Sequence, residues 1–190
     1  MSVRRTFIAI DISETAREAI TEYIKRLRYD FPRVNIGWER PEKLHFTIRF
    51  LGDTAEDDLE RVCQIAKSVA REFTPFEVRI TETGVFPHPK SPRILWLGGR
   101  QGSDEMVKLN LDIQARLQAA GFPREKRTFH PHLTIGRIRD QLRSRELVRT
   151  HKQRQLGPIM FIATSLTLYE SKLQKAGSVY SAIRPFPFSR

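Results

Sequence analysis

A chain of 190 residues, 39% of them hydrophobic, can bury one good core or two small fused cores, and its composition is not that of a disordered protein. Its 33 Lys+Arg residues against 22 Asp+Glu give a net charge of +11, which favours anionic partners such as nucleic acid. An anionic membrane is excluded as a partner, because no amphipathic helix has a large basic face. No apolar stretch approaches the ~20 residues of a membrane span.

The N-terminal run is too short and too charged for a secretory signal, so we expect a cytoplasmic protein. Cys63 is the only cysteine, which excludes an intramolecular disulfide and a thiolate metal cluster. It lies among apolar residues at helical spacing, and this predicts a buried core thiol rather than a nucleophile.

Strand and helix signals alternate along the chain, and their order repeats. The first half predicts a strand, helix, strand, helix and strand at residues 6–10, 13–28, 44–50, 55–73 and 76–80. Ser13 is the predicted N-cap of the first helix. The second half predicts the same order at residues 93–97, 104–120, 130–138, 141–150 and 160–169, with a last strand at 179–183.

Each half therefore has the order β-α-β-α-β, which predicts an α+β fold with two pseudo-symmetric lobes in a single domain over residues 1–190. The lobes would correspond approximately to the halves 1–88 and 89–190, joined near residues 87–92. The order of the strands, and any exchange of strands between the lobes, cannot be read from the sequence.

Two copies of one short pattern, His-x-Thr, occur in a chain with five histidines: His45 with Thr47 and His132 with Thr134. Two imidazoles with nearby hydroxyls can make and break a phosphate ester without a metal ion. On a strand, side chains two residues apart point to the same face, so His45, Thr47 and Arg49 should share one face. A pseudo-twofold arrangement of the lobes would then bring the two His/Thr pairs opposite each other across a cleft.

The surroundings of the two motifs also match. Aligning His45 on His132 pairs Ile48 with Ile135. The apolar runs of two further candidate strands, at Phe7 and Ile94, each lie 38 residues before their histidine. The parallel indicates a duplicated unit.

These blocks, residues 45–52 (His-Phe-Thr-Ile-Arg-Phe-Leu-Gly) and 129–137 (Phe-His-Pro-His-Leu-Thr-Ile-Gly-Arg), resemble the paired motifs of the 2H phosphoesterase superfamily. More closely, the chain resembles RNA 2′,3′-cyclic phosphodiesterases, also called 2′-5′ RNA ligases. The likeness includes residues 5–10, 92–98 and 168–173, and Tyr180. It implies a bilobal fold with antiparallel-rich sheets lining a central cleft and helices outside. It also implies hydrolysis of RNA 2′,3′-cyclic phosphate ends to 2′-phosphomonoesters, with no metal and no cofactor, and in many members reversible 2′-5′ ligation.

The chemistry of the residues fits that reaction. In-line opening of a cyclic phosphodiester needs a base for the attacking water and an acid for the leaving ribose oxygen, and a histidine pKa of ~6.5 suits both roles. By the resemblance, His45 would be the proton donor and His132 the proton acceptor, whereas the residues alone leave that assignment open. The hydroxyls of Thr47 and Thr134 would bind the non-bridging phosphate oxygens.

Two further site residues follow from the resemblance. Phe50, five residues after the first histidine, would stack on the terminal base, and Arg137, five after the second, would bind phosphate. Simple alternation puts both on the face opposite the histidines. Either the strands twist or bulge there, for which Gly136 offers a means in the second copy, or these two residues are structural.

Other histidines and loops have plainer interpretations. His88 and His151, taken singly, are predicted to be structural. His130 and His132 could chelate a metal, but no nearby Asp, Glu or Cys completes a ligand shell. The glycine-rich segment 98–102 lacks the ending of a phosphate loop and is predicted to be a turn. The Arg-rich region 137–154 is either a solvated helix face or a track for an RNA backbone.

Two functional hypotheses remain. The first is a monomeric enzyme acting on RNA with 2′,3′-cyclic phosphate ends or on small cyclic nucleotides. The second is a basic RNA-binding module with little or no catalysis, in which the histidines serve as phosphate ligands. The sequence does not decide the natural substrate, its length, or whether ligation is physiological.

Overall fold

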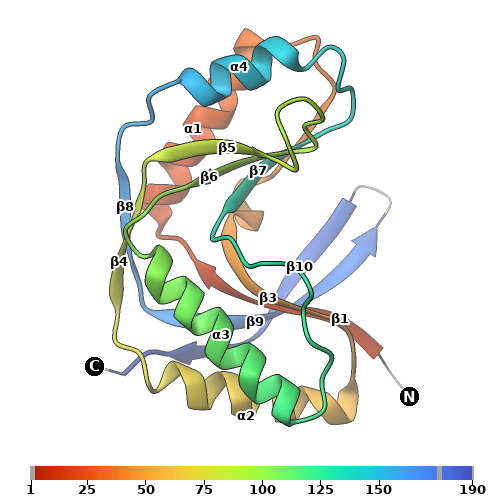
Figure 1. Cartoon of the computed structure of the whole chain (residues 1–190), viewed down its shortest axis with the longest axis vertical. Helices are drawn as coiled ribbons and strands as arrows, with labels where there is room; N and C mark the ends of the chain where they lie inside the picture. The colour runs from red at the N-terminus through yellow and green to blue at the C-terminus, as the bar shows by residue number, and fades with distance from the viewer. Residues whose placement is uncertain (1–2, 175–176, 190) are drawn as a thin grey trace.

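The computed structural model describes residues 3–174 and 177–189, and within them it shows antiparallel sheet covered by helices (Figure 1). The α-helices are α1 (Glu14–Asp30), α2 (Glu56–Ala70), α3 (Ser103–Ala119) and α4 (Arg145–Gln153), with a 3-10 turn η1 at Pro41–Lys43. The strands are β1 (Val3–Asp11), β2 (Ile36–Trp38), β3 (His45–Ala55), β4 (Phe76–Ile80), β5 (Glu82–Phe86), β6 (Ile94–Gly98), β7 (Leu133–Ile138), β8 (Ile159–Ala163), β9 (Ser165–Gln174) and β10 (Gly177–Pro187). The predicted α+β class is confirmed.

One large sheet runs through the molecule in the order β10-β9-β1-β3-β7-β6-β5, and β2 pairs with β7 beside it. Its two halves are joined where β3 meets β7, at the single aligned pair Phe46 and Leu133. Strands β4 and β8 form a separate two-stranded sheet. The large sheet is therefore two smaller sheets that meet at one narrow junction.

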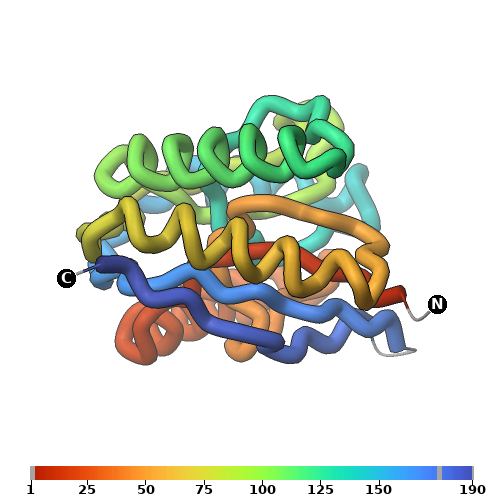
Figure 2. Tube along the Cα trace, turned by 90° about the horizontal axis from the view of Figure 1, so that it is seen from below, coloured from red at the N-terminus to blue at the C-terminus, as the bar shows by residue number. Residues whose placement is uncertain are grey.

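Helices pack on both halves of the large sheet. Helices α2 and α3 pack side by side, α2 against β10 and both against β3 (Figure 2). Helix α4 packs against β5 on the other half, and α1 contacts η1 and β8. The lobes do not coincide with residues 1–88 and 89–190, because β1 from the first half of the chain pairs on one side with β3 and on the other with the C-terminal strand β9, which in turn pairs with β10.

Local sequence signals account for the helix ends. The hydroxyl of Ser13 accepts a hydrogen bond from the amide of Ala16, 3.2 Å away, and this confirms the predicted N-cap of α1. Three acidic residues occupy the first turn of α2, where they complement the helix dipole. Gly102 precedes α3 with φ of 84°, and a Cβ there would lie 2.9 Å from the carbonyl oxygen of Glu77. The turn before α3 therefore requires glycine.

The main differences between the predicted elements and the structure concern strands β2, β5, β7, β8 and β9 and the start of helix α4. The predicted strand 160–169 is two strands, β8 and β9, which separate at Thr164 and join different sheets. Strand β7 begins at Leu133 rather than at residue 130, since Pro131 has no amide proton for the ladder. Strands β2 and β5 were not predicted, because β2 is three residues long and β5 contains Gly84. Helix α4 starts at Arg145, after turns at 141–144.

Within the described residues, the structure has no helix that is both long and apolar enough to cross a membrane. Cys63 is buried in the core against which α2 packs, as predicted.

Candidate active site

The two His-x-Thr motifs meet at the junction of the sheet. Phe46 and Leu133, the pair that joins β3 to β7, are the residues immediately after His45 and His132. In an antiparallel ladder the residue before one partner lies towards the residue after the other, so each histidine lies towards the threonine of the other motif. The pseudo-twofold axis therefore passes between the motifs. The two imidazoles are close enough that a charge on His132 lowers the pKa of His45.

The two copies pair with their preceding strands in the same register. Phe7 aligns with Phe50 in the first copy, and Ile94 aligns with Arg137 in the second. This shared register explains why Phe7 and Ile94 precede their histidines by the same number of residues. The duplication seen in the sequence is thus a duplication of strand pairing.

Both copies contain a bulge at the equivalent position. The pairing of β1 with β3 skips Ile48, since Ala9 aligns with Thr47 and Ile8 with Arg49. The pairing of β6 with β7 skips Ile135 in the same way. Because a bulge inserts one extra residue, it reverses the alternation of the side chains that follow.

The reversal brings Phe50 and Arg137 to the face of the histidines. Phe50 aligns with Phe7, and the Phe7 ring stacks on His45 with a centroid separation of 5.0 Å. Simple alternation was therefore wrong at these positions, and wrong too for Arg49, which turns away from His45 and is buried. The bulge that the sequence left as an alternative is present in both copies.

His45 lies in an aromatic environment. Its ring is stacked on Phe7, lies 6.1 Å from the Tyr169 ring, and meets Tyr180 edge-on at 5.5 Å. Its Nε2 is 3.0 Å from the Thr47 hydroxyl, and a backbone hydrogen bond joins the ring to Lys43, two residues earlier. Burial lowers the pKa of His45 to about 4, and the carboxylate of Asp11 acts in the opposite direction.

His132 has a different electrostatic environment. Its Nδ1 donates to the carbonyl oxygen of His130, 2.7 Å away and again two residues earlier, so Nε2 has the lone pair of the neutral ring. The Phe86 ring meets it edge-on at 4.9 Å. Burial lowers the pKa of His132, the hydrogen bond to the His130 carbonyl acts in the opposite direction, and the neighbouring charges of His130 and Arg137 lower it further.

Arg137 is held by a carboxylate. Its Nε donates to the Oε1 of Glu39, 3.2 Å away, and the Glu39 side chain is only 14% exposed. Glu39 extends the pairing of β2 with β7, since its amide donates to the carbonyl oxygen of Ile135. Because Glu39 engages Nε, the Nη1 and Nη2 edge of the guanidinium is the edge that suits a phosphate.

The remaining histidines lie apart from this site. His151 is fully buried, with Nδ1 2.8 Å from the Tyr23 hydroxyl and Nε2 near the carbonyl oxygens of Gly84 and Trp96. This confirms that His151 is structural. His88 accepts a hydrogen bond from the amide of Lys90 in a surface loop. Over residues 3–174 and 177–189, no three His, Cys, Asp or Glu side chains gather as they would around a metal ion.

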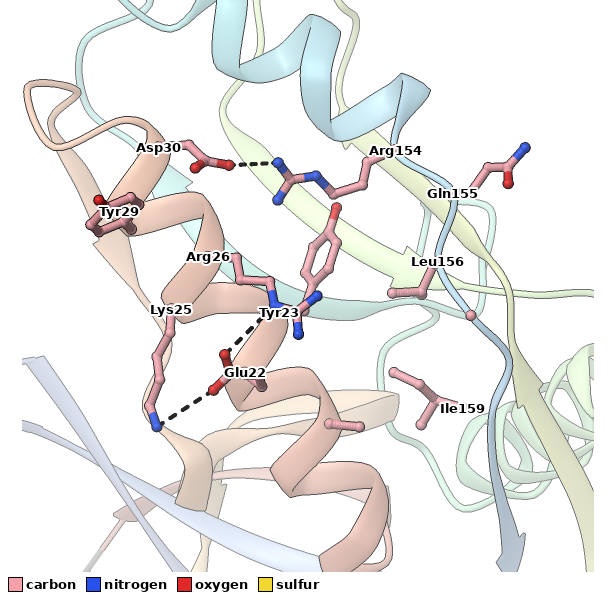
Figure 3. A pocket seen from close by; sticks show the side chains of 12 residues that line it. Glu22, Tyr23, Lys25, Arg26, Tyr29, Asp30, Arg154, Gln155, Leu156 and Ile159 are labelled. Atoms are coloured by element: carbon pink, nitrogen blue, oxygen red, sulfur yellow. Dashed lines mark hydrogen bonds and ion pairs between the residues drawn. The ribbon is translucent and has the colours of Figure 1, made fainter.

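A surface pocket of about 940 Å³ lies elsewhere, between α1 and the segment that follows α4 (Figure 3). None of the predicted site residues lines it. Its charged side chains pair with one another, Asp30 with Arg154 and Glu22 with both Lys25 and Arg26. The pocket therefore offers little uncompensated charge to a ligand.

Sequence reasoning missed three residues of the site: Asp11, Glu39 and Tyr169. Asp11 directly follows the segment 5–10 that carries the family resemblance, and Tyr169 lies within the segment 168–173. Nothing in the sequence shows that Asp11 lies opposite His45 on a neighbouring strand. Glu39 follows a strand too short to predict.

Comparison with known proteins gives matches along nearly the whole chain. The family model described as LigT like Phosphoesterase matches residues 10–96 and 100–180. The RNA 2′,3′-cyclic phosphodiesterase of Archaeoglobus fulgidus is 31% identical over 183 residues, covering 96% of this chain and 99% of the relative. The protein of the same name from Methanothermobacter thermautotrophicus is 30% identical over 185 residues, covering 96% and 97%.

Among solved structures, the crystal structure of TT0787 from Thermus thermophilus covers 97% of each chain with a TM-score of 0.78. Its sequence is 24% identical, so this likeness bears on the fold alone. The two chains therefore share a fold although their sequences have diverged.

Proposed function

The chain belongs to the family of LigT-like phosphoesterases, and from that premise we propose that it hydrolyses RNA 2′,3′-cyclic phosphates to 2′-phosphomonoesters without a metal ion. The observation that supports this most directly is the meeting of two His-x-Thr motifs about one junction of strands. Two imidazoles on either side of a phosphorus atom can act as the acid and base of an in-line displacement.

His132 is the general base in this proposal. Its Nδ1 proton is engaged by the His130 carbonyl oxygen, which leaves the Nε2 lone pair to accept a proton from water. Burial and the charge of Arg137 disfavour the protonated ring before the reaction. His45 is the general acid and donates its proton to the 3′ oxygen as the P–O bond breaks. Each such transfer contributes typically 10²–10⁴-fold.

Thr47, Thr134 and Arg137 bind the phosphate. The two hydroxyls donate to the non-bridging oxygens, whose charge redistributes in the transition state. Arg137, oriented by Glu39, adds a bidentate contact. The anionic substrate also raises the pKa of His45 above its value in the free protein, which favours the protonated form that the acid role requires.

Phe50 stacks on the base of the terminal nucleotide. Its side chain is 58% exposed although it is a large apolar residue, and the Phe7 ring behind it, 5.9 Å between centroids, supports it from the core side. The net charge of +11 favours RNA ends over neutral ligands. Small cyclic nucleotides and reversible 2′-5′ ligation fit the same site, and we propose that the protein acts as a cytoplasmic monomer.

The proposal is tested by incubating the purified protein with an oligonucleotide ending in a 2′,3′-cyclic phosphate, in EDTA. Conversion to the 2′-phosphate is expected. An intact substrate that nonetheless binds the protein would favour the basic RNA-binding module instead, and loss of activity only on addition of EDTA would indicate a metal-dependent reaction.

A further inference from the structure

The two copies of the duplicated unit differ at one position beside the histidines. Ile10 aligns with Phe46 in the first copy, and Leu97 aligns with Leu133 in the second. The next position along each ladder faces the histidine. In the first copy Asp11 aligns with His45, and in the second copy the residue at that position is Gly98.

The Asp11 carboxylate is fixed by two hydroxyl donors from β9. Tyr169 donates to Oδ1 at 2.6 Å, and Thr167 donates to Oδ2 at 2.8 Å. The ring of the same Tyr169 lies parallel to the imidazole of His45, so one side chain contacts both partners. Three adjacent strands, β9, β1 and β3, thus hold a negative charge beside the first imidazole.

The second copy has no carboxylate at this position, and a side chain there would be crowded. A Cβ added to Gly98 would lie 3.2 Å from the Trp96 ring and 3.3 Å from the carbonyl oxygen of Pro131. The charged side chains that act on His132 are instead basic, His130 and Arg137. The position equivalent to Arg137 in the first copy is the uncharged Phe50. A site built from two similar units therefore has a carboxylate beside its first imidazole and, at the equivalent position, none beside its second.

We propose that Asp11 is the positioning residue that favours the protonated form of His45, the form that acts as the acid. Asp11 acts through His45 and does not touch the substrate. The inference rests on the proposed function, and it adds what the duplicated motifs cannot supply, a physical reason for the direction of proton transfer.

Other groups around His45 do not replace Asp11. Arg17 from α1 and His132 from the other copy both disfavour a protonated His45. Tyr169 and Tyr180 are neutral, because burial raises the pKa of each phenol. Lys43 contributes its backbone, and its ammonium group lies over the Tyr180 ring, 5.6 Å from the centroid. Against the burial that lowers the pKa of His45 to about 4, Asp11 is the charged group that acts in the other direction.

The test is the pH dependence of kcat for Asp11→Asn, which removes the charge but retains an acceptor oxygen. A general acid is active while protonated, so a lower pKa of His45 moves the alkaline limb of kcat to lower pH, by about one unit. Turnover at pH 8 should fall ~10-fold, with little change at the acidic end. Asp11→Glu should restore most of the shift.

Asp58→Asn is the matched control, since it removes the same charge from a carboxylate that pairs with Arg61 on α2 and belongs to no part of the site. The alkaline limb of its kcat profile should stay in place. An unmoved limb in Asp11→Asn, or an equal shift in Asp58→Asn, would overturn the proposal. The activity of the unmutated protein tests the proposed function separately. In a variant that is inactive, NMR titration with inorganic phosphate bound measures the pKa of His45 directly. An unchanged titration midpoint of His45 in Asp11→Asn would also overturn the proposal.

Discussion

Nη2 of Arg49 donates a hydrogen bond to the carbonyl oxygen of Pro123, 2.6 Å away, from a side chain that is only 5% exposed. Nη1 of the same guanidinium lies 3.4 Å from the Glu125 carboxylate. Arg49 follows the bulge in β3, and Pro123 and Glu125 belong to the loop that leads to His132. The strand of the first motif therefore anchors the segment that carries the second.

Replacing Arg49 by Met should loosen this loop. Removal of a buried charged donor costs about 1.5–3 kcal/mol, and we expect a lower Tm together with a fall in kcat of roughly 10-fold as His132 loses its position. Arg61→Met is the control, because Arg61 also donates to a backbone carbonyl near this loop, that of Ala120, but from an exposed side chain. Equal effects of the two variants on kcat would show that the buried anchor is unimportant.

Arg137→Lys tests the phosphate contact. Lysine keeps the positive charge but cannot offer two parallel donors while a third nitrogen binds Glu39. We expect kcat/KM to fall ~10-fold or more, because a charge-assisted bond contributes about 1.5–3 kcal/mol. Arg143→Lys, at an exposed ion pair with Asp140, should change kcat/KM little. If both variants behave alike, Arg137 contributes only its charge.

Phe50→Ala tests the stacking platform. Loss of a stacked base costs about 1–3 kcal/mol, so KM for a cyclic-phosphate oligonucleotide should rise at least several-fold. An oligonucleotide whose terminal nucleotide lacks its base should show no such difference between Phe50→Ala and the unmutated protein. Leu142→Ala removes another exposed apolar side chain and serves as the control. A KM penalty that is independent of the base would count against stacking.

The buried pair of Tyr23 and His151 should make stability depend on pH. Burial lowers the pKa of His151 from 6.5 to about 4 in the folded protein, so between these values the unfolded chain binds more protons. The free energy of unfolding therefore decreases as pH falls from about 6.5 towards 4, by on the order of 3 kcal/mol.

Denaturant unfolding at pH 7 and at pH 4.5 measures this loss. Tyr23→Phe should cost about 1–2 kcal/mol at pH 7, since Nδ1 of His151 would lose its donor. Constant stability across this range would mean that His151 becomes protonated without cost.

The sequence was most informative where a signal was repeated or local. The two His-x-Thr motifs, their 38-residue offsets and the Ser13 cap all correspond to features of the structure. Phe50, Arg137 and Arg49 were misplaced by simple alternation, because a one-residue bulge has no strong sequence signature when the skipped residue is an ordinary isoleucine. Glycine marked the bulge only in the second copy, at Gly136, next to the skipped Ile135.

Pairing between distant strands was the part that the sequence could not supply. Asp11 and His45 are partners because β3 pairs antiparallel with β1, and Tyr169 joins them from β9, near the end of the chain. Such contacts depend on sheet order, which a single sequence does not determine. The difference between the two histidines is therefore visible only in three dimensions.

The most direct test is the turnover of a 2′,3′-cyclic-phosphate oligonucleotide in EDTA by the unmutated protein, His45→Ala and His132→Ala, with the product identified as 2′- or 3′-phosphate. We expect a 2′-phosphate product and a fall in kcat of ~10² or more for each variant, with little change in KM. Near-normal turnover by either variant would contradict the two-histidine mechanism.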